Sequence, residues 1–147
     1  MTPVKQMLAI ATCSTALIAT AAVAQPGVTK FTAVLTGAAE VPGPGDPDGR
    51  GEATIIVNSV KGQICWEINV RDIETATAAH IHSGEAGAAP PNNVVLGLSA
   101  PDTDNDSSGC ESVAPALADA IRASPQSYYV NVHNAPYPAG ALRGQLG

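Results

Sequence analysis

Short runs of alternating apolar and polar residues, separated by turn residues, are the feature that most limits the fold of this chain. The run at 63–70, Q-I-C-W-E-I-N-V, places an apolar residue at every second position. A period of two is typical of a strand with one buried face. The preceding run, 52–60, is rich in β-branched residues, and Lys61-Gly62 between the two runs favours a tight turn. These features predict a β-hairpin.

Similar runs recur along the chain. They predict further strands, for about seven in all, at 28–35, 77–82, 94–98, 128–133 and 141–146. Loops rich in glycine, proline and aspartate are predicted at 42–51, 83–93 and 100–109. One helix is predicted at about 113–123, from the helical spacing of Val113, Leu117, Ala120 and Ile121. The pattern predicts an all-β fold with one short helix, either a β-sandwich or a small Greek-key barrel.

The first 24 residues have the composition of an export leader. Lys5 gives a positive start, the stretch from Met7 to Ala22 is almost all apolar or small, and Ala22-Val23-Ala24 fits an A-x-A cleavage site. The apolar stretch is too short and too rich in alanine for a membrane span. We predict a signal peptide at 1–24, a domain at 25–147 with no membrane span after cleavage, and a periplasmic or secreted protein. A lipoprotein signal ending at Cys13 is the alternative.

The net negative charge of the chain argues against nucleic acid as a partner. The chain has 7 basic and 13 acidic residues, a net charge of −6. Removal of the leader takes away Lys5 and no acidic residue, so the domain carries 6 − 13 = −7. Binding to nucleic acid requires clustered lysine and arginine. We therefore expect no nucleic-acid partner.

Two cysteines remain after the leader is removed, Cys65 and Cys110. An even pair in an exported protein favours a disulfide, because the compartment is oxidising. We predict a Cys65–Cys110 disulfide, and a pair of free buried thiols is the alternative.

All three histidines lie in or at the end of predicted strands. His80 and His82 are two positions apart, so a strand projects them to one face, and His133 ends the run at 128–133. Each of the three lies on the face of its strand opposite the more apolar face. If the two strands are neighbours, the histidines converge into a three-histidine metal site with one open coordination position. Copper and zinc are the ions that imidazole ligands suit.

Such a site needs groups that orient the imidazole rings. The candidates from the sequence are Glu40, Glu85 and Asn131, and Arg143 is a further candidate at the edge of the site. Arg143 has one functional interpretation, as an anion or carboxylate binder, and one structural interpretation, as the partner of Glu40 or Glu67 in an internal salt bridge. A polar histidine cluster that only holds two strands in register is the alternative to a metal site.

The acidic run Asp102 to Asp106, D-T-D-N-D, does not fit a calcium loop. An EF-hand loop needs glycine at its sixth position and glutamate at its twelfth, and here those positions are Ser107 and Val113. We interpret the run as a solvated loop.

The chain resembles the CHRD domain, the module found in chordin and in exported bacterial proteins. The resemblance rests on segments that follow one another in order: L-T-G-A-A-E-V-P at 35–42, C-W-E-I-N-V at 65–70, A-A-H-I-H-S-G at 78–84, P-Q-S-Y-Y-V-N-V-H-N at 125–134 and Y-P-A-G-A-L-R-G-Q-L at 137–146. It covers nearly all of 25–147. The resemblance implies an immunoglobulin-like sandwich and, by analogy with chordin, an extracellular protein partner.

The functional hypothesis is a non-catalytic extracytoplasmic module that binds a copper or zinc ion through His80, His82 and His133. The first alternative is a protein-interaction or matrix module in which these histidines are structural. The second is an enzyme with a single copper or zinc ion, since three histidines leave a position for water. The sequence contains neither a G-x-S-x-G motif nor a phosphate-binding or dinucleotide-binding fingerprint.

Overall fold

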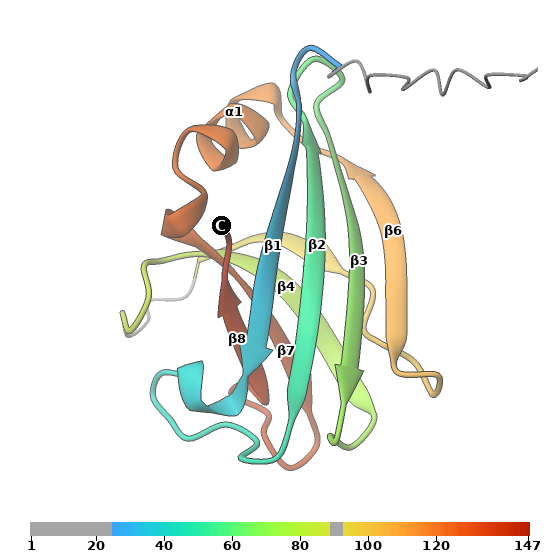
Figure 1. The fold of residues 1–147 in the computed structure, drawn as a ribbon, viewed down its shortest axis with the longest axis vertical. Coiled ribbons are helices and arrows are strands. Elements are labelled where there is room, and N and C mark those ends of the chain that lie inside the picture. Colours follow the sequence, from blue (N-terminus) through green and yellow to red (C-terminus); the bar gives the residue numbers. More distant parts are fainter. Residues whose placement is uncertain (1–24, 89–92) are drawn as a thin grey trace, which may run out of the picture.

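The computed structural model describes residues 25–88 and 93–147 (Figure 1). Within them lie one α-helix, α1 (Pro115–Ala123), and two short 3-10 helices, η1 (Gly37–Ala39) and η2 (Pro125–Ser127). The strands are β1 (Val28–Thr36), β2 (Arg50–Asn58), β3 (Gln63–Arg71), β4 (Ala76–Ser83), β5 (Asn93–Leu98), β6 (Asp106–Ser112), β7 (Tyr128–Asn134) and β8 (Leu142–Gln145). The predicted all-β class with one short helix is confirmed.

The strands form one sheet in the order β5-β4-β7-β8-β1-β2-β3-β6, and neighbouring strands are antiparallel. The sheet curls over itself, so that β4, β7 and β8 lie behind β1, β2 and β3 in Figure 1. Apolar side chains from both halves meet in one buried core, to which β1, β2, β3, β4 and β7 all contribute. The inner face of the curled sheet is therefore the core, and the other face is available for a site.

The predicted hairpin is confirmed as β2 and β3. Ile55 pairs with Trp66 and Val57 pairs with Ile64, and all four are buried. The turn between the strands includes Gly62 at φ +60°, a conformation that glycine adopts without steric cost. The period of two in the sequence therefore decided both the register and the buried face.

The helix α1 begins at Pro115, two residues later than predicted. Proline suits the first helical turn, where its missing N–H would have no partner. The helix ends at Ala123, before Pro125, which disfavours helical backbone at the residue preceding it. Ala118 and Ile121 are its fully buried residues, and the helix contacts β2 and β3. Val113, counted in the predicted apolar stripe, precedes the helix.

The strand β6 was not predicted, because the loop prediction for 100–109 extended into it. Its sequence, D-S-S-G-C-E-S, contains only small and polar residues apart from Cys110, and Ser107 is its one buried residue. Gly109 lies against the Trp66 ring, where a Cβ atom would come within 2.5 Å of the ring. This strand is held by pairing with β3, by the fit of Gly109 and by a disulfide, and none of these gives an alternating apolar pattern.

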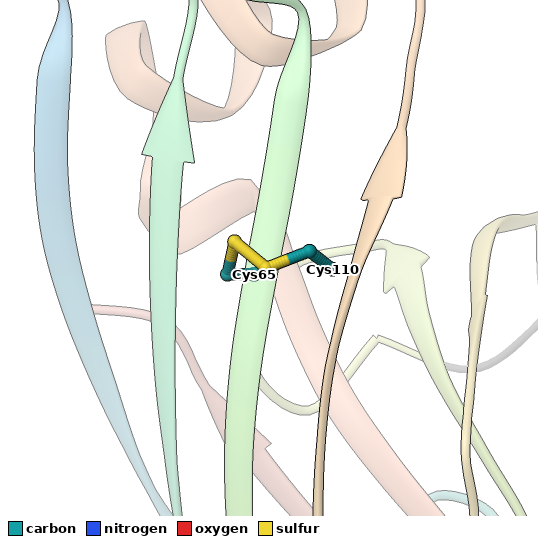
Figure 2. Close-up of a disulfide and its surroundings, with 2 residues drawn as sticks. All are labelled: Cys65 and Cys110. Atoms are coloured by element: carbon teal, nitrogen blue, oxygen red, sulfur yellow. A yellow bond between two sulfur atoms is a disulfide. The ribbon is translucent and has the colours of Figure 1, made fainter.

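The disulfide prediction is confirmed. Cys65 and Cys110 are directly opposite each other on β3 and β6 and are bonded across the two strands (Figure 2). The bond ties the edge strand to its neighbour and closes a loop with a sequence separation of 45 residues.

The predicted signal peptide, residues 1–24, lies outside the described residues. Across 25–88 and 93–147, no helix combines the length and the apolar character that a membrane crossing requires.

Candidate metal centre

Neighbouring strands bring the three histidines together. β4 and β7 pair so that His80 is opposite Asn131, His82 is opposite Tyr129, and His133 is opposite Ala78. Residues directly opposite in an antiparallel pair project to the same face. His80, His82 and His133 therefore share the face turned away from the core, whereas Ala79 and Ile81, on either side of His80, are buried in the core.

The rings are in contact range. The Nδ1 atom of His80 is 3.3 Å from the Nε2 atom of His133. The ring centroids are 5.2 Å apart for His80 and His133, and 5.5 Å apart for His80 and His82. One ring nitrogen from each of the three residues can be chosen so that all three atoms lie within 4.8 Å of one another. The convergence expected from the sequence is present.

The His133 ring is oriented by a main-chain carbonyl. Its Nδ1 atom lies 3.1 Å from the carbonyl oxygen of Pro138. A carbonyl oxygen only accepts hydrogen bonds, so Nδ1 carries the proton and donates it. In the neutral ring Nε2 then has a lone pair, and Nε2 is the atom that faces His80. A hydrogen bond of this kind is what usually fixes the tautomer of a metal-binding histidine.

His82 is the most deeply buried of the three, at 3 % exposure. Its ring stacks on the Tyr129 ring, with centroids 4.9 Å apart and planes 5° from parallel. Both of its ring nitrogens are buried, and neither has a hydrogen-bond partner. Buried polar atoms almost always have partners, and leaving one without a partner costs free energy. A ligand on one of these nitrogens would remove part of that cost.

The environment favours the neutral, metal-binding form of all three imidazoles. Burial lowers the pKa of His82 to about 4, with smaller contributions from His80, His133 and Arg143. Burial also lowers the pKa of His80, helped by His133, and lowers the pKa of His133 despite the Pro138 carbonyl. Neutral imidazoles have a free lone pair at neutral pH, so an ion would not have to displace protons from them.

The spacing suits a small transition-metal ion. Two nitrogens at 2.0–2.1 Å from a tetrahedral ion are about 3.3 Å apart, which matches the His80–His133 separation. One ring nitrogen from each of the three residues lies within 4.8 Å of the other two, which is about 1.5 Å or less beyond this spacing. Rotation of a side chain covers such a shift.

One side of the site is open. Gly97 on β5 is directly opposite His80, and a Cβ atom at Gly97 would meet nothing within 4 Å. His80 is accordingly half-buried rather than fully enclosed. An ion held by three histidines would have room for water or a small ligand in its fourth position.

The other predicted site residues make hydrogen bonds to groups other than the histidines. Asn131 donates from its Nδ2 atom to the Glu40 carboxylate and, at 3.0 Å, to the Leu142 carbonyl. Burial raises the pKa of Glu40 to about 7, against the lowering effects of Arg143 and Asn131. Glu85 is exposed and contributes its main-chain carbonyl, which accepts from Arg143. The Pro138 carbonyl that orients His133 was not predicted, since a main-chain carbonyl has no signature in the sequence.

The acidic run forms a tight turn. The main-chain N–H of Asp104 donates to the Asp102 carboxylate at 2.8 Å, and the N–H of Asn105 donates to the Asp102 carbonyl. Among the residues that the structure describes, the three histidines form a group of potential metal ligands close enough to share an ion, and the acidic turn forms no such group. The acidic turn leads directly into β6.

A search of curated proteins and a search of solved structures each found no match. The profile of the CHRD domain family matches residues 31–146, which is nearly the whole chain. The matched region contains most of β1, all of β2 to β8, and the three histidines. The chain belongs to the CHRD domain family.

Proposed function

We propose that this protein is an exported, non-catalytic module that binds one copper or zinc ion through His80, His82 and His133. The observation that carries the proposal is the buried His82 ring, whose two nitrogens have no partner although two other imidazoles lie beside it. A purely structural cluster would satisfy its buried polar atoms, as the His133 ring does through Pro138. An ion bound to His82 accounts for the exception.

The ligand atoms follow from the hydrogen bonds. His133 would use Nε2, because its Nδ1 donates to Pro138. His80 would use Nδ1, which faces that atom. Three neutral imidazoles bring no negative charge to the ion, and this ligand set suits copper and zinc better than calcium or magnesium, which prefer oxygen ligands.

The test is the stoichiometry of metal binding by protein purified without a histidine tag and stripped with a chelator. We expect one copper or zinc ion per chain by elemental analysis, and a higher melting temperature with the ion, because a ligand of the native state stabilises it. His82→Ala should abolish both effects. Asp104→Asn, in the exposed acidic turn, is the matched control and should change neither. Unchanged binding in His82→Ala, or no binding in the wild type, would contradict the proposal.

Export is supported by the leader pattern at 1–24 and by a disulfide of the kind that persists in oxidising compartments. Sequencing the N-terminus of the protein from its native host tests this part. We expect a chain that begins at Gln25. An intact Met1 or a lipid-modified Cys13 would contradict it.

The alternative of a protein-interaction module makes a different prediction for the same experiment. If the histidines only hold β4 and β7 together, copper and zinc will leave the melting temperature unchanged and a chelator will have no effect. The 3.3 Å contact between His80 and His133 is the observation that favours this alternative.

A further inference from the structure

A second candidate binding site lies beside Arg143, and the residues that line it include no histidine. A groove of about 320 Å³ runs between the segment after β1 and the segment after β4. Its lining residues are Ala38, Ala39, Val41, Ala86, Gly87, Arg143 and Gln145. The volume is at the lower end of the range for small-molecule sites. We call this feature the Arg143 groove.

The charged residue of the groove is Arg143, which as a whole is 2 % exposed. One Nη atom donates to the Glu85 carbonyl at 2.8 Å and the other to the Ala88 carbonyl at 3.3 Å. The guanidinium carbon also lies 3.6 Å from the centroid of the Tyr129 ring. These acceptors are neutral, whereas a guanidinium has five N–H donors and pairs best with a carboxylate or a phosphate.

The nearest acidic group neutralises this cation only in part. Glu40 accepts a hydrogen bond from Asn131, and burial raises the pKa of Glu40 to about 7, so the carboxyl is partly protonated at neutral pH. A buried cation without a full counter-charge is costly. A negatively charged ligand would supply that counter-charge.

The walls of the groove indicate which chemical groups the uncharged part of a ligand would carry. Ala38, Ala39 and Ala86 present methyl groups, Val41 adds a larger apolar surface, and Gly87 has no side chain. Gln145 is fixed by two hydrogen bonds of 2.6 Å, from its Nε2 to the carbonyls of Gly84 and Gln126. The groove therefore combines one cationic end with small apolar walls.

We propose that the Arg143 groove binds a small organic carboxylate, with the acid group at Arg143 and a short apolar body against the alanine and valine walls. The volume suits one such molecule rather than a length of peptide chain. The histidine site is a separate site, since no histidine lines the groove and the Tyr129 ring contacts both His82 and the Arg143 guanidinium. The proposal does not depend on a bound metal.

The test compares benzoate with benzamide, which has the same shape and no charge, by titration followed with NMR or calorimetry in the presence of a chelator. We expect benzoate to bind at least tenfold more tightly. Ala86→Trp, at an exposed position on the rim, should weaken benzoate binding at least tenfold by filling the groove. Ala116→Trp, on the exposed surface of α1, is the control and should have no effect.

Arg143→Lys keeps a positive charge but loses the planar pair of donors, so it should also weaken binding. Because Arg143 is buried and could be needed for folding, Ala86→Trp is the decisive variant. His82→Ala should retain benzoate binding, which separates this proposal from the metal proposal. Equal binding of benzoate and benzamide, no binding of benzoate, unchanged binding in Ala86→Trp, or binding of acetyl-dialanine in place of benzoate would overturn the proposal.

Discussion

His82 is the residue on which the candidate metal centre depends. Its ring is buried and stacked on Tyr129, and its two nitrogens lack partners. In the metal-free protein this arrangement destabilises the fold, since a buried polar atom without a hydrogen bond costs about 1–3 kcal/mol. A residue that is costly for folding and useful for binding an ion is expected at a functional site.

His82→Phe should separate the two effects. Phenylalanine keeps the flat ring against Tyr129 and removes both unpartnered nitrogens, so we expect the free energy of unfolding of the metal-free protein to rise by about 1–3 kcal/mol. The same variant should bind no copper or zinc. Urea denaturation with chelator and with added ion measures both effects. Lower stability of the metal-free variant would contradict the interpretation of His82 as an unsatisfied group.

Two buried groups should make the stability of the metal-free protein depend on pH in opposite directions. The pKa of His82 is lowered from 6.5 to about 4, so between these values the unfolded chain binds more protons and stability falls as the pH falls. The pKa of Glu40 is raised from 4.5 to about 7, so between these values the folded protein holds its proton and stability falls as the pH rises. The two effects partly cancel between about pH 4.5 and 6.5.

Variants should expose each effect. In His82→Phe the Glu40 effect remains and the His82 effect is removed, so relative to the wild type the free energy of unfolding should rise more, or fall less, as the pH is lowered from 6.5 to 4.5. The lowered pKa values of His80 and His133 act in both proteins and do not change this comparison. In Glu40→Gln the His82 effect remains, and the free energy of unfolding should decrease as the pH is lowered from 6.5 to 4. Urea denaturation across this range measures both slopes. Parallel pH profiles for the two variants would rule out these assignments.

At the scale of elements, β6 depends on a covalent bond more than on packing. A sequence separation of 45 residues corresponds to about 4 kcal/mol of stabilisation in the loop-entropy treatment of disulfides. Reduction should lower the free energy of unfolding by about this amount and should first expose the amide protons of β6 to exchange. Thermal unfolding and hydrogen exchange with and without a reductant measure this. Equal exchange rates in β6 before and after reduction would show that pairing alone holds the strand.

The elements that could be predicted from the sequence are those that bury one face. The alternation in β3 and the β-branched run in β2 identify a hairpin because burial requires that pattern. β6 carries no such signal, since it fits under Trp66 through a glycine and is fixed by Cys110. The shared face of His80 and His82 was predictable from their spacing, and the Pro138 carbonyl that orients His133 was not.

At the scale of the whole molecule, curling of one sheet separates the core from the candidate sites. The apolar side chains of β4 and β7 point into the core, and the histidines lie on the other face of the same strands. His80 and His133, 53 residues apart in the sequence, meet because β4 and β7 are neighbours. The Arg143 groove could not be anticipated, because its walls come from three segments whose proximity depends on the complete fold.

This separation has a consequence for binding. Because the histidines are outside the core, an ion should bind with small movements of side chains and without repacking of the β1–β3 half. The backbone amide signals of that half should therefore keep their chemical shifts when zinc is added, whereas those of β4 and β7 should change. Large shifts throughout β1–β3 would contradict this picture.

A crystal structure of the copper- or zinc-loaded protein, with the ion located by anomalous scattering, tests the central claim most directly. We expect one ion bonded at about 2.0–2.1 Å to Nδ1 of His80, to Nε2 of His133 and to one ring nitrogen of His82. An ion bound elsewhere on the protein, or a His82 ring that remains unbound at saturating metal, would contradict it.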